Sequence, residues 1–358
     1  MSFFFDCRFI RVDHHDGISR FSSELFAAVA NKVSVTALIC DLDQLRELPQ
    51  GIDHLVVNDP KNPWLELLLP RKLNRHGASI VFSPMQTMGS LGKKYRLILT
   101  LHDLIYYKHR KPPGSLAWPI RLVWRLFHLS FTPVRILLNR SDAVVTISET
   151  TKGLIGSNHL TRRPVHVLYN ASSMPTVNAA KTAPKSKNLV YMGSYMPYKN
   201  VEVLIRAMEE LTEYTLTLCS KVEPKRKAQL LSKSTAAASS RIRFMDGASE
   251  AEYLQILDDS FALVSASKDE GFGIPVVEAM SRSIPVVLAD IPIFREVAST
   301  AGVFFHSTAP ADFASAVKSL EAQDAWQMAS QKCLERSNFF DWNESASKLV
   351  VAIESITR

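Results

Sequence analysis

The stretch "KDEGFGIPVVEAMSRSIPVV" (Lys268–Val287) follows an apolar run, "FALVSA" (Phe261–Ala266), that has the composition and length of a β-strand. Pro275 occupies a position that is typical of the first turn of a helix. Gly271 and Gly273 are therefore predicted to lie in a turn between the strand and a helix. The free backbone N–H groups at a helix start favour an anion, most naturally a phosphate. The stretch thus predicts a strand, a turn and a helix arranged around a phosphate site.

Two carboxylates flank this turn, because Glu270 precedes Gly271 and Glu278 follows eight residues after Glu270. Carboxylates beside a bound phosphate would repel it, so we expect them to accept hydrogen bonds from hydroxyl groups instead. A ligand with phosphate in its middle and hydroxyls at both ends is a nucleotide-sugar. The local pattern therefore indicates a nucleotide-sugar donor.

The composition is that of a globular protein. The chain has 358 residues, 46% of them hydrophobic and 22% charged, which is enough for two domains with substantial cores. Its four cysteines are scattered and are expected to be reduced and buried in a cytosolic protein. The first residues favour a strand over a signal peptide, and no apolar run approaches the ~20 residues of a membrane span.

The net charge of +7 is unevenly distributed. Residues 1–172 contain 22 Lys and Arg against 13 Asp and Glu, whereas the remainder contains 20 against 22. The basic first half indicates an anionic partner, such as a membrane surface, a lipid phosphate or nucleic acid, or else only a basic solvated surface. Nucleic acid is not expected, because no reader motif is present and aromatic residues are not interleaved with a basic stripe.

Strand-like runs alternate with helix-like runs along the whole chain, seven in the first half and six in the second. Nearly continuous apolar strands between helices indicate parallel sheets covered on both faces. The predicted fold class is α/β, with two doubly wound, Rossmann-like domains and a cleft between them, and ligands are expected at the carboxyl ends of the strands. The predicted divisions are a first domain (1–172), a linker (173–187), a second domain (188–336) and a last helix crossing back to the first domain (337–358).

Two stretches of the first half carry candidate ligand groups. Gly17 lies between Asp16 and a helix expected over about residues 19–30, so it marks either a second phosphate-binding turn or an ordinary tight turn. His102 and Asp103 end the strand "LILTLHD" and are expected to face the cleft, the alternative being a buried structural histidine.

In the second half, "VYMGSYMPYKNVEVLIRAM" leads from a strand to Lys199, just before a helix. A lysine at this point could neutralise a diphosphate leaving group, or it could be a solvated loop charge.

Two places in the sequence carry residues of the types that bind metal ions. Asp41 and Asp43 follow an apolar strand, where a metal-dependent glycosyltransferase would hold a divalent ion. His14 and His15 lie between two aspartates, but adjacent residues of an extended segment point to opposite faces and no distant cluster completes a ligand set. The sequence predicts neither a metal nor a cofactor.

The segment Ser115–Val145 combines tryptophan and phenylalanine with four arginines. It could be an amphipathic surface resting on anionic lipid, or its apolar face could belong to the core while its arginines are solvated. The sequence does not separate these two interpretations.

Taken together and in order, these stretches resemble retaining glycosyltransferases of family 4, which have the two-domain GT-B fold. The resemblance rests on "DGISRFSSEL", "LTLHDLIYY", "NRSDAVVTISETTKGLI", "VYMGSYMPYKNVEVLIRAM" and "SASKDEGFGIPVVEAM", and it covers nearly the whole chain. Two positions depart from the family pattern. Ser194 stands where many members have an arginine, for which Arg20 could or could not substitute, and Ser283 stands where a glycine is usual.

The resemblance implies a role for each matching residue. Glu278 should bind the nucleotide ribose, and Glu270 the hydroxyls of the transferred sugar. The remaining assignments are the backbone of Phe272, Gly273 and Ile274 near the phosphates, Ser194 and Lys199 at the diphosphate, Gly17 against the diphosphate from the first domain, and His102, with Asp103, near the reacting end of the sugar.

The resemblance also implies a reaction. A hexose, first of all mannose from GDP-mannose, would pass with retention and without a metal to a lipid-linked or cell-envelope glycan. The protein would be cytoplasmic, with peripheral attachment to the inner face of the membrane as an option. A donor carrying UDP and a sugar-nucleotide epimerase of the same fold remain as alternatives, and the pattern does not fix the acceptor or linkage.

Overall fold

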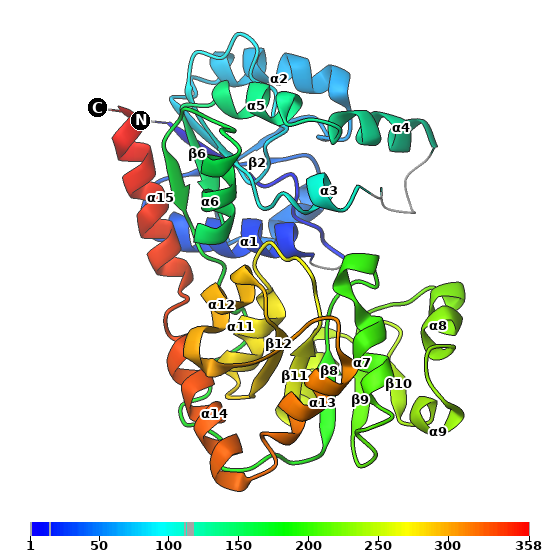
Figure 1. The fold of residues 1–358 in the computed structure, drawn as a ribbon. Coiled ribbons are helices and arrows are strands. Elements are labelled where there is room, and N and C mark those ends of the chain that lie inside the picture. Colours follow the sequence, from blue (N-terminus) through cyan, green and yellow to red (C-terminus); the bar gives the residue numbers. More distant parts are fainter. Residues whose placement is uncertain (1, 14–15, 111, 113–117, 358) are drawn as a thin grey trace. The chain divides into compact units, whose positions relative to one another are not determined.

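The chain forms two compact units in this computed structural model, which describes residues 2–13, 16–110, 112 and 118–357. Unit 1 comprises Met1–Asn170 and Asp341–Arg358, and unit 2 comprises Ala171–Phe340. Each unit is built on one parallel sheet, of seven strands in unit 1 and six in unit 2 (Figure 1). The predicted α/β class and the numbers of strands are confirmed.

Unit 1 has the strand order β3-β2-β1-β4-β5-β6-β7, so β2 and β3 lie on one side of β1 and β4 to β7 on the other. The strands are β1 (Phe3–Asp6), β2 (Thr36–Ile39), β3 (His54–Val56), β4 (Ile80–Ser83), β5 (Arg96–Thr100), β6 (Ala143–Thr146) and β7 (Val165–Val167). The helices are α1 (Gly17–Ala30), η1 (Leu42–Glu47), α2 (Pro63–Arg75), α3 (Ile105–Lys108), α4 (Trp118–Phe127), α5 (Thr132–Asn139), α6 (Glu149–Ser157) and α15 (Trp342–Thr357).

Unit 2 has the strand order β10-β9-β8-β11-β12-β13. Its strands are β8 (Asn188–Tyr191), β9 (Thr215–Leu218), β10 (Ile242–Phe244), β11 (Ala262–Ser265), β12 (Val286–Ala289) and β13 (Gly302–Phe305). Its helices are η2 (Pro197–Lys199), α7 (Val201–Ala207), α8 (Pro224–Leu231), α9 (Ala236–Ser239), α10 (Glu250–Asp258), α11 (Ile274–Ser281), α12 (Pro292–Ala298), η3 (Ser299–Ala301), α13 (Pro310–Lys318) and α14 (Gln323–Ser337).

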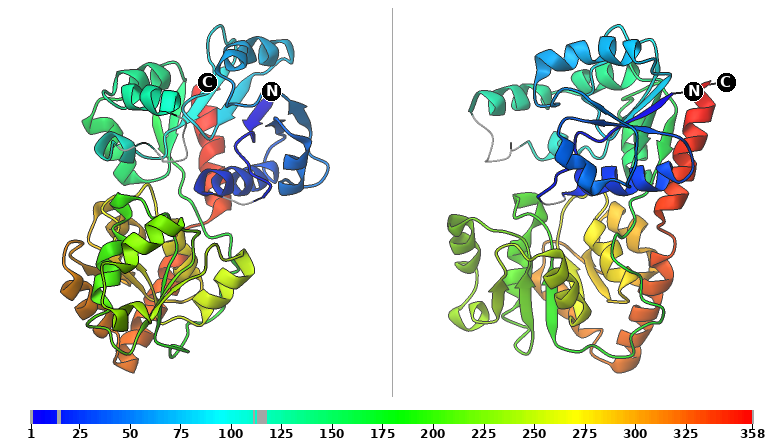
Figure 2. Two further views of the ribbon diagram at one scale, coloured as in Figure 1. Left: turned by 90° about the vertical axis from the view of Figure 1, so that its right-hand side faces the viewer. Right: turned by 180° about the vertical axis from the view of Figure 1, so that it is seen from behind.

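The last helix, α15, belongs to unit 1 and packs against α1 (Figure 2). Asp341 caps it by accepting hydrogen bonds from the backbone N–H groups of Asn343 and Glu344. Ser345 Oγ donates to the carbonyl of Tyr169 at 2.7 Å, and the Trp342 ring lies 6.1 Å from that of Phe21. The apolar face of this helix is therefore buried within the first unit.

The segment expected to be a linker is attached to unit 2. The Val177 N–H donates to the carbonyl of Ser281, and Lys181 Nζ pairs with Asp258 at 3.1 Å. Lys181 N also donates to Ser283 Oγ. The predicted linker is rich in Pro, Ala, Ser and Lys, a composition typical of linkers. These contacts attach it to unit 2.

Ser283 explains one departure from the family pattern. Its φ is +58°, in the left-handed region that glycine adopts without strain. The Ser283 hydroxyl lies 2.7 Å from Ser330 Oγ, and both side chains are fully buried. The hydrogen bonds of this buried hydroxyl compensate for a conformation in which a side chain is disfavoured.

Of the helices that the structure describes, none combines the length and the apolar composition needed to cross a bilayer.

Candidate functional site

The start of α11 has the geometry predicted for the turn after β11. Gly273 has φ +95°, and a Cβ added there would stand 3.0 Å from the ring of Phe294. The neighbouring Phe272 side chain is buried and meets the Phe340 ring edge-on at 5.5 Å. Because the side chain of Phe272 points into the core, only its backbone is suited to contact a ligand, as the resemblance implies.

Glu270 and Lys199 lie together. Lys199 Nζ is 2.5 Å from Glu270 Oε1, and Ser267 Oγ donates to the same oxygen at 2.8 Å. Both side chains of the pair are largely buried, with 15% and 12% of their surface exposed. The lysine predicted to meet phosphates and the glutamate predicted to meet sugar hydroxyls are therefore held in one hydrogen-bonded group.

The position of Lys199 is fixed by its neighbour Asn200, which has a left-handed φ of +55°. The Asn200 side-chain amide donates to the carbonyls of Ala266, at 3.2 Å, and Ser307, at 2.6 Å. The backbone around the lysine is thus tied to the loop after β11 and to the loop after β13.

Glu278 lies in the second turn of α11 and is 3% exposed. Burying a carboxylate is costly unless polar groups surround it, and most glutamates therefore lie at the surface. The burial of Glu278 is thus unusual for this residue type.

The loop that carries Ser194 is held by its neighbours. Tyr191 Oη donates to the carbonyl of Ser194 at 2.6 Å, and a Cβ on Gly193 would come within 2.9 Å of that hydroxyl oxygen. Arg226 Nε donates to the carbonyl of Tyr195 at 3.2 Å, and its other end pairs with Glu202 at 2.6 Å. Sequence reasoning missed Arg226, because the residue lies far along the chain and only tertiary structure brings it to the loop.

In unit 1, His102 follows β5. Its Nε2 lies 2.7 Å from the carbonyl oxygen of Pro84, and its ring meets Phe21 edge-on at 5.1 Å. Because a carbonyl can only accept, Nε2 carries the proton and leaves Nδ1 as an acceptor. Burial lowers the pKa of His102 from an ordinary value near 6.5 to about 4. The imidazole is therefore neutral at physiological pH and could accept a hydrogen bond from a hydroxyl.

Asp103 and Gly17 have local roles besides the predicted ones. Asp103 Oδ1 accepts from the N–H of Ile105, the first residue of α3. Gly17 is the first residue of α1, two residues earlier than predicted, because Asp16 caps the helix. The Asp16 carboxylate accepts from the N–H groups of Ile18 and Ser19. The Asp16 carboxylate thus satisfies two of the N–H groups at this helix start.

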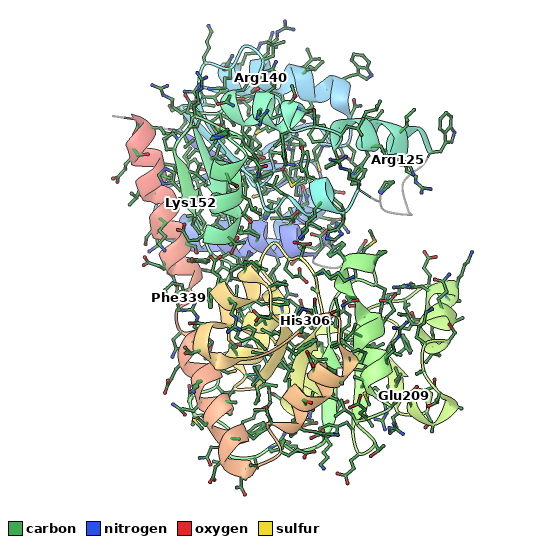
Figure 3. The ribbon with its side chains drawn as sticks, viewed as in Figure 1. Arg125, Arg140, Lys152, Glu209, His306 and Phe339 are labelled. Atoms are coloured by element: carbon green, nitrogen blue, oxygen red, sulfur yellow. The ribbon has the colours of Figure 1, made fainter. Side chains whose placement is uncertain are left out.

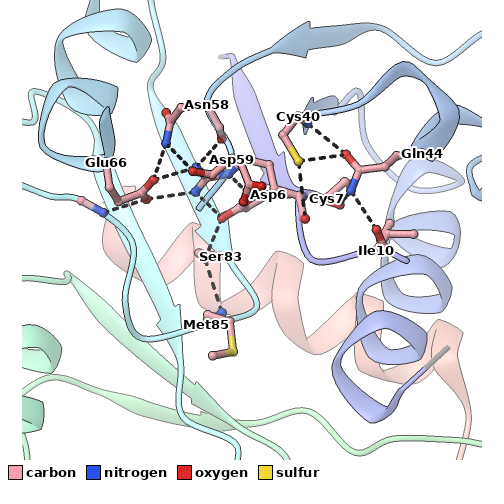
Figure 4. Close-up of polar contacts among 12 residues, drawn as sticks. Asp6, Cys7, Ile10, Cys40, Gln44, Asn58, Asp59, Glu66, Ser83 and Met85 are labelled. Atoms are coloured by element: carbon pink, nitrogen blue, oxygen red, sulfur yellow. Dashed lines mark hydrogen bonds and ion pairs between the residues drawn. The ribbon is translucent and has the colours of Figure 1, made fainter. Parts of the chain in front are cut away.

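Sequence reasoning also missed a buried polar cluster at the carboxyl end of β1 (Figure 4). Arg8 is 4% exposed and lies between Asp6, at 2.7 Å, and Glu66, at 2.8 Å. Burial alone would lower the pKa of Arg8, but its two carboxylate partners raise it. Ser83 Oγ donates to Asp6, so the cluster joins β1, β4 and the first turn of α2.

The aspartates of the metal-dependent alternative have local partners: Asp41 caps η1, and Asp43 forms an ion pair. Asp41 accepts from the N–H of Asp43 in a capping box with Gln44, and Asp43 pairs with Arg46 at 3.0 Å. In the described part of the chain, no group of three or more His, Cys, Asp or Glu side chains could hold a metal ion. His14 and His15 lie outside the described residues.

Comparison with known proteins gives matches to two family models. Residues 17–172 match the model "Glycosyltransferase Family 4", and residues 176–335 match "Glycosyl transferases group 1". The chain is 27% identical over 228 residues to the O-antigen chain mannosyltransferase RfbU of Salmonella typhimurium. This match covers 62% of this chain and 60% of that protein. The chain is 36% identical over 107 residues to the serotype-specific mannosyltransferase WbdA of Escherichia coli, a match of 27% of this chain and 13% of that protein.

These matches span less than two thirds of either relative's length. Among solved structures, sucrose-phosphate synthase from Thermosynechococcus elongatus has a TM-score of 0.76 at 15% identity and covers 99% of both chains. Anabaena HepE, solved in complex with UDP and glucose, has a TM-score of 0.73 at 16% identity, covering 99% of this chain and 100% of that one. At such identities the likeness shows the fold, which is GT-B. The predicted family is confirmed, and the chain belongs to the group 1, family 4 glycosyltransferases, whose members are retaining, metal-independent hexosyltransferases.

Proposed function

We propose that this protein transfers mannose from GDP-mannose to a hydroxyl group of a lipid-linked or cell-envelope glycan, with retention at the anomeric carbon. Two relatives, an O-antigen chain mannosyltransferase and a serotype-specific mannosyltransferase, support the choice of sugar and the class of acceptor. The observation that carries the proposal is the Lys199–Glu270 pair beside the start of α11, in the stretch that resembles the family's donor site.

In this proposal, unit 2 binds the donor. Glu278 accepts hydrogen bonds from the ribose hydroxyls, and Glu270 accepts them from the transferred sugar. Lys199 and the backbone N–H groups of Phe272, Gly273 and Ile274 contact the diphosphate, with Ser194 beside it. From unit 1, Gly17 contributes at the diphosphate, and His102 and Asp103 at the sugar.

The reaction breaks the bond between the anomeric carbon and the oxygen of the leaving phosphate. The acceptor oxygen forms a bond to that carbon from the same face, and its proton passes to the leaving phosphate. Negative charge develops on the diphosphate as the bond breaks, so an ammonium group and helix N–H groups stabilise the transition state more than the ground state. Such preorganised groups supply several kcal/mol, on the order of what one or two oxyanion donors give.

We further propose that the protein works at the cytoplasmic membrane surface, where a lipid-linked acceptor is held. The excess of 22 basic over 13 acidic residues in residues 1–172 supports attachment to anionic lipid.

A panel of nucleotide-sugars tests the choice of donor. The purified protein is incubated with GDP-mannose, UDP-glucose and other donors, and hydrolysis and thermal stabilisation are measured. We expect GDP-mannose to give the largest rise in melting temperature and the fastest release of nucleotide. A preference for a UDP-sugar would overturn the assignment of the base. Conversion of the donor to its epimer without an acceptor would indicate the epimerase alternative instead.

A further inference from the structure

Helix α2 exposes large apolar side chains to solvent. Trp64 is 78% exposed, and Leu65, Leu67 and Leu68 are each close to half exposed. Leu69 and Leu73 of the same helix are buried and belong to the core cluster beneath it. A single exposed leucine is ordinary, but one tryptophan and three leucines exposed within five residues mark an interaction surface.

Helix α4 repeats this arrangement. Trp118 is 76% exposed, and Leu122, Val123 and Leu126 are between 50% and 66% exposed. The opposite face is fixed by aromatic packing, because Trp124 meets Tyr106 and His128 at centroid distances of 5.1 Å and 4.1 Å. The interpretation in which the apolar face of the Ser115–Val145 segment is core therefore fails for α4, although Val134 and Leu138 of α5 are buried.

The two helices present the same three side chains at the same spacing. Trp64, Leu68 and Arg71 on α2 and Trp118, Leu122 and Arg125 on α4 both occupy positions i, i+4 and i+7, which lie on one face of a helix. All six residues are exposed. A tryptophan is thus followed by a leucine and then an arginine about 10 Å further along each helix.

The face of α2 is held rigidly. Glu66, the one acidic residue of this helix, is buried and paired with Arg8, so it adds no negative charge to the exposed surface. Its carboxylate also accepts from Asn58 Nδ2 at 2.7 Å and from the N–H of Gly89. The helix is therefore bound to the sheet through its charged side chain, and its apolar side chains are left outside.

The charge around both helices is positive. The stretch from Leu104 to Ser141 contains seven Lys and Arg residues and no Asp or Glu. On α2, Arg71, Lys72 and Arg75 are exposed beyond the apolar residues. Both helices lie in the part of unit 1 drawn uppermost in Figures 1 and 2, and Figure 3 labels Arg125 on α4 and Arg140 at the end of α5.

From this repeated pattern we infer that α2 and α4 together form a lipid-binding surface, with Trp64 and Trp118 inserted at the bilayer interface and Arg71 and Arg125 on lipid phosphates. Tryptophan rings favour the interface between hydrocarbon and headgroups, and arginines complement an anionic leaflet. The inference rests on the proposed work at a membrane and deepens it. It assigns a lipid-binding role to α2, which the sequence analysis did not single out. Two inserted tryptophans should also hold the protein on a membrane more tightly than one helix alone.

Vesicle binding tests the assignment. The whole protein is sedimented with vesicles containing roughly 30 mol% phosphatidylglycerol, and with neutral phosphatidylcholine vesicles, at low and high salt. We expect binding to the anionic vesicles that falls with salt. The W64S/W118S variant should lose about tenfold or more in partitioning, because both apolar anchors are removed. The R71E/R125E variant should lose its preference for the anionic vesicles.

Matched controls exclude a general effect of the substitutions. K225E/K233E makes the same change in charge at exposed positions of unit 2 and should bind vesicles like the unchanged protein. Quenching of tryptophan fluorescence by brominated phospholipid should be lost in W64F/W118F, which leaves the other three tryptophans in place. Equal vesicle binding by W64S/W118S and the unchanged protein would overturn the proposal.

Two further outcomes keep the tests separate. If the protein forms a dimer without lipid that W64S/W118S dissociates, the surface is an interface between copies and the lipid assignment is wrong. Hydrolysis of GDP-mannose in solution does not involve these helices, so the vesicle variants should retain it. Loss of vesicle binding with hydrolysis intact and failure of mannosyl transfer with vesicle binding intact are therefore distinguishable results.

Discussion

Lys199 Nζ lies 2.5 Å from Glu270 Oε1, so the cation expected at the leaving group and the carboxylate expected at the sugar form an ion pair. Ser267 also donates to this carboxylate oxygen. The ion pair holds Lys199 in position, but the negative charge of Glu270 partly offsets the positive charge of the lysine. Phosphate bound at this place would therefore compete with Glu270 for Lys199, and the two side chains should act as one unit.

Replacing Lys199 should act mainly on turnover. We expect K199M to lower kcat about 100-fold or more with a smaller change in donor KM, because the ammonium meets charge that develops in the transition state. K225M on the surface of unit 2 is the control. The double variant K199M/E270Q should be less impaired than the two single effects combined. A rise in KM with unchanged kcat would show that Lys199 contributes only ground-state binding.

Glu278 should affect donor binding more than turnover. We expect E278A to raise the donor KM by about tenfold or more while kcat changes much less, because contacts to ribose are the same in the ground and transition states. Since Glu278 is 3% exposed, E278Q provides a variant that keeps the shape of the buried side chain. Thermal unfolding of both variants checks the fold. A larger fall in kcat than rise in KM would argue against the ribose assignment.

His102 should make the stability of the protein depend on pH. Burial lowers its pKa to about 4, so the folded state binds fewer protons than the unfolded state between about pH 4 and 6.5. Stability is therefore fully present above pH 6.5 and falls by at most about 3 kcal/mol as the pH drops to about 4. Urea unfolding from pH 4.5 to 7 should show this slope, and H102Q should flatten it. H54Q changes an exposed histidine and should leave the slope unchanged.

Gly89 should tolerate no side chain. A Cβ there would stand 2.0 Å from the carbonyl oxygen of Glu66 on α2. Pro70, four residues later in that helix, has no N–H to bond to this carbonyl, and the backbone of Gly89 approaches it instead. We expect G89A to lower the free energy of unfolding by about 1–3 kcal/mol.

The control for this prediction is Gly153 in α6, where nothing lies within 4 Å of an added Cβ. G153A should be neutral or stabilising by up to about 1 kcal/mol, because alanine favours the helix. Unfolding by urea measures both variants, and equal behaviour would show that α2 moves freely to make room.

Metal removal should leave activity unchanged. We expect the rate of sugar transfer to be the same in EDTA as in manganese, because Lys199 and helix N–H groups are proposed to stabilise the leaving group. Loss of turnover in EDTA that manganese restores would instead favour the Asp41 and Asp43 alternative, despite the capping role of Asp41 and the Asp43–Arg46 ion pair.

The sequence by itself determined the fold class, the numbers of strands and the family. These features depend on local patterns. Runs of apolar residues predict the buried parallel strands, and glycine and proline mark the turn before α11. The ends of helices were predicted less accurately where a capping side chain decides them. Helix α1 begins at Gly17, two residues before the predicted start, because Asp16 caps it.

Only the tertiary structure decided which distant residues meet. Arg8 pairs with Glu66, 58 residues away, and Arg226 reaches the loop at Tyr195, because crossover connections bring separate strands and helices to one edge of a sheet. It also decided which apolar residues face water. Helix α2 contains five leucines and a tryptophan, yet packing buries Leu69 and Leu73 and leaves Trp64 and Leu68 exposed. The sequence shows which side chains are apolar, but only the packed fold shows which of them are covered by the rest of the chain and which remain exposed to water.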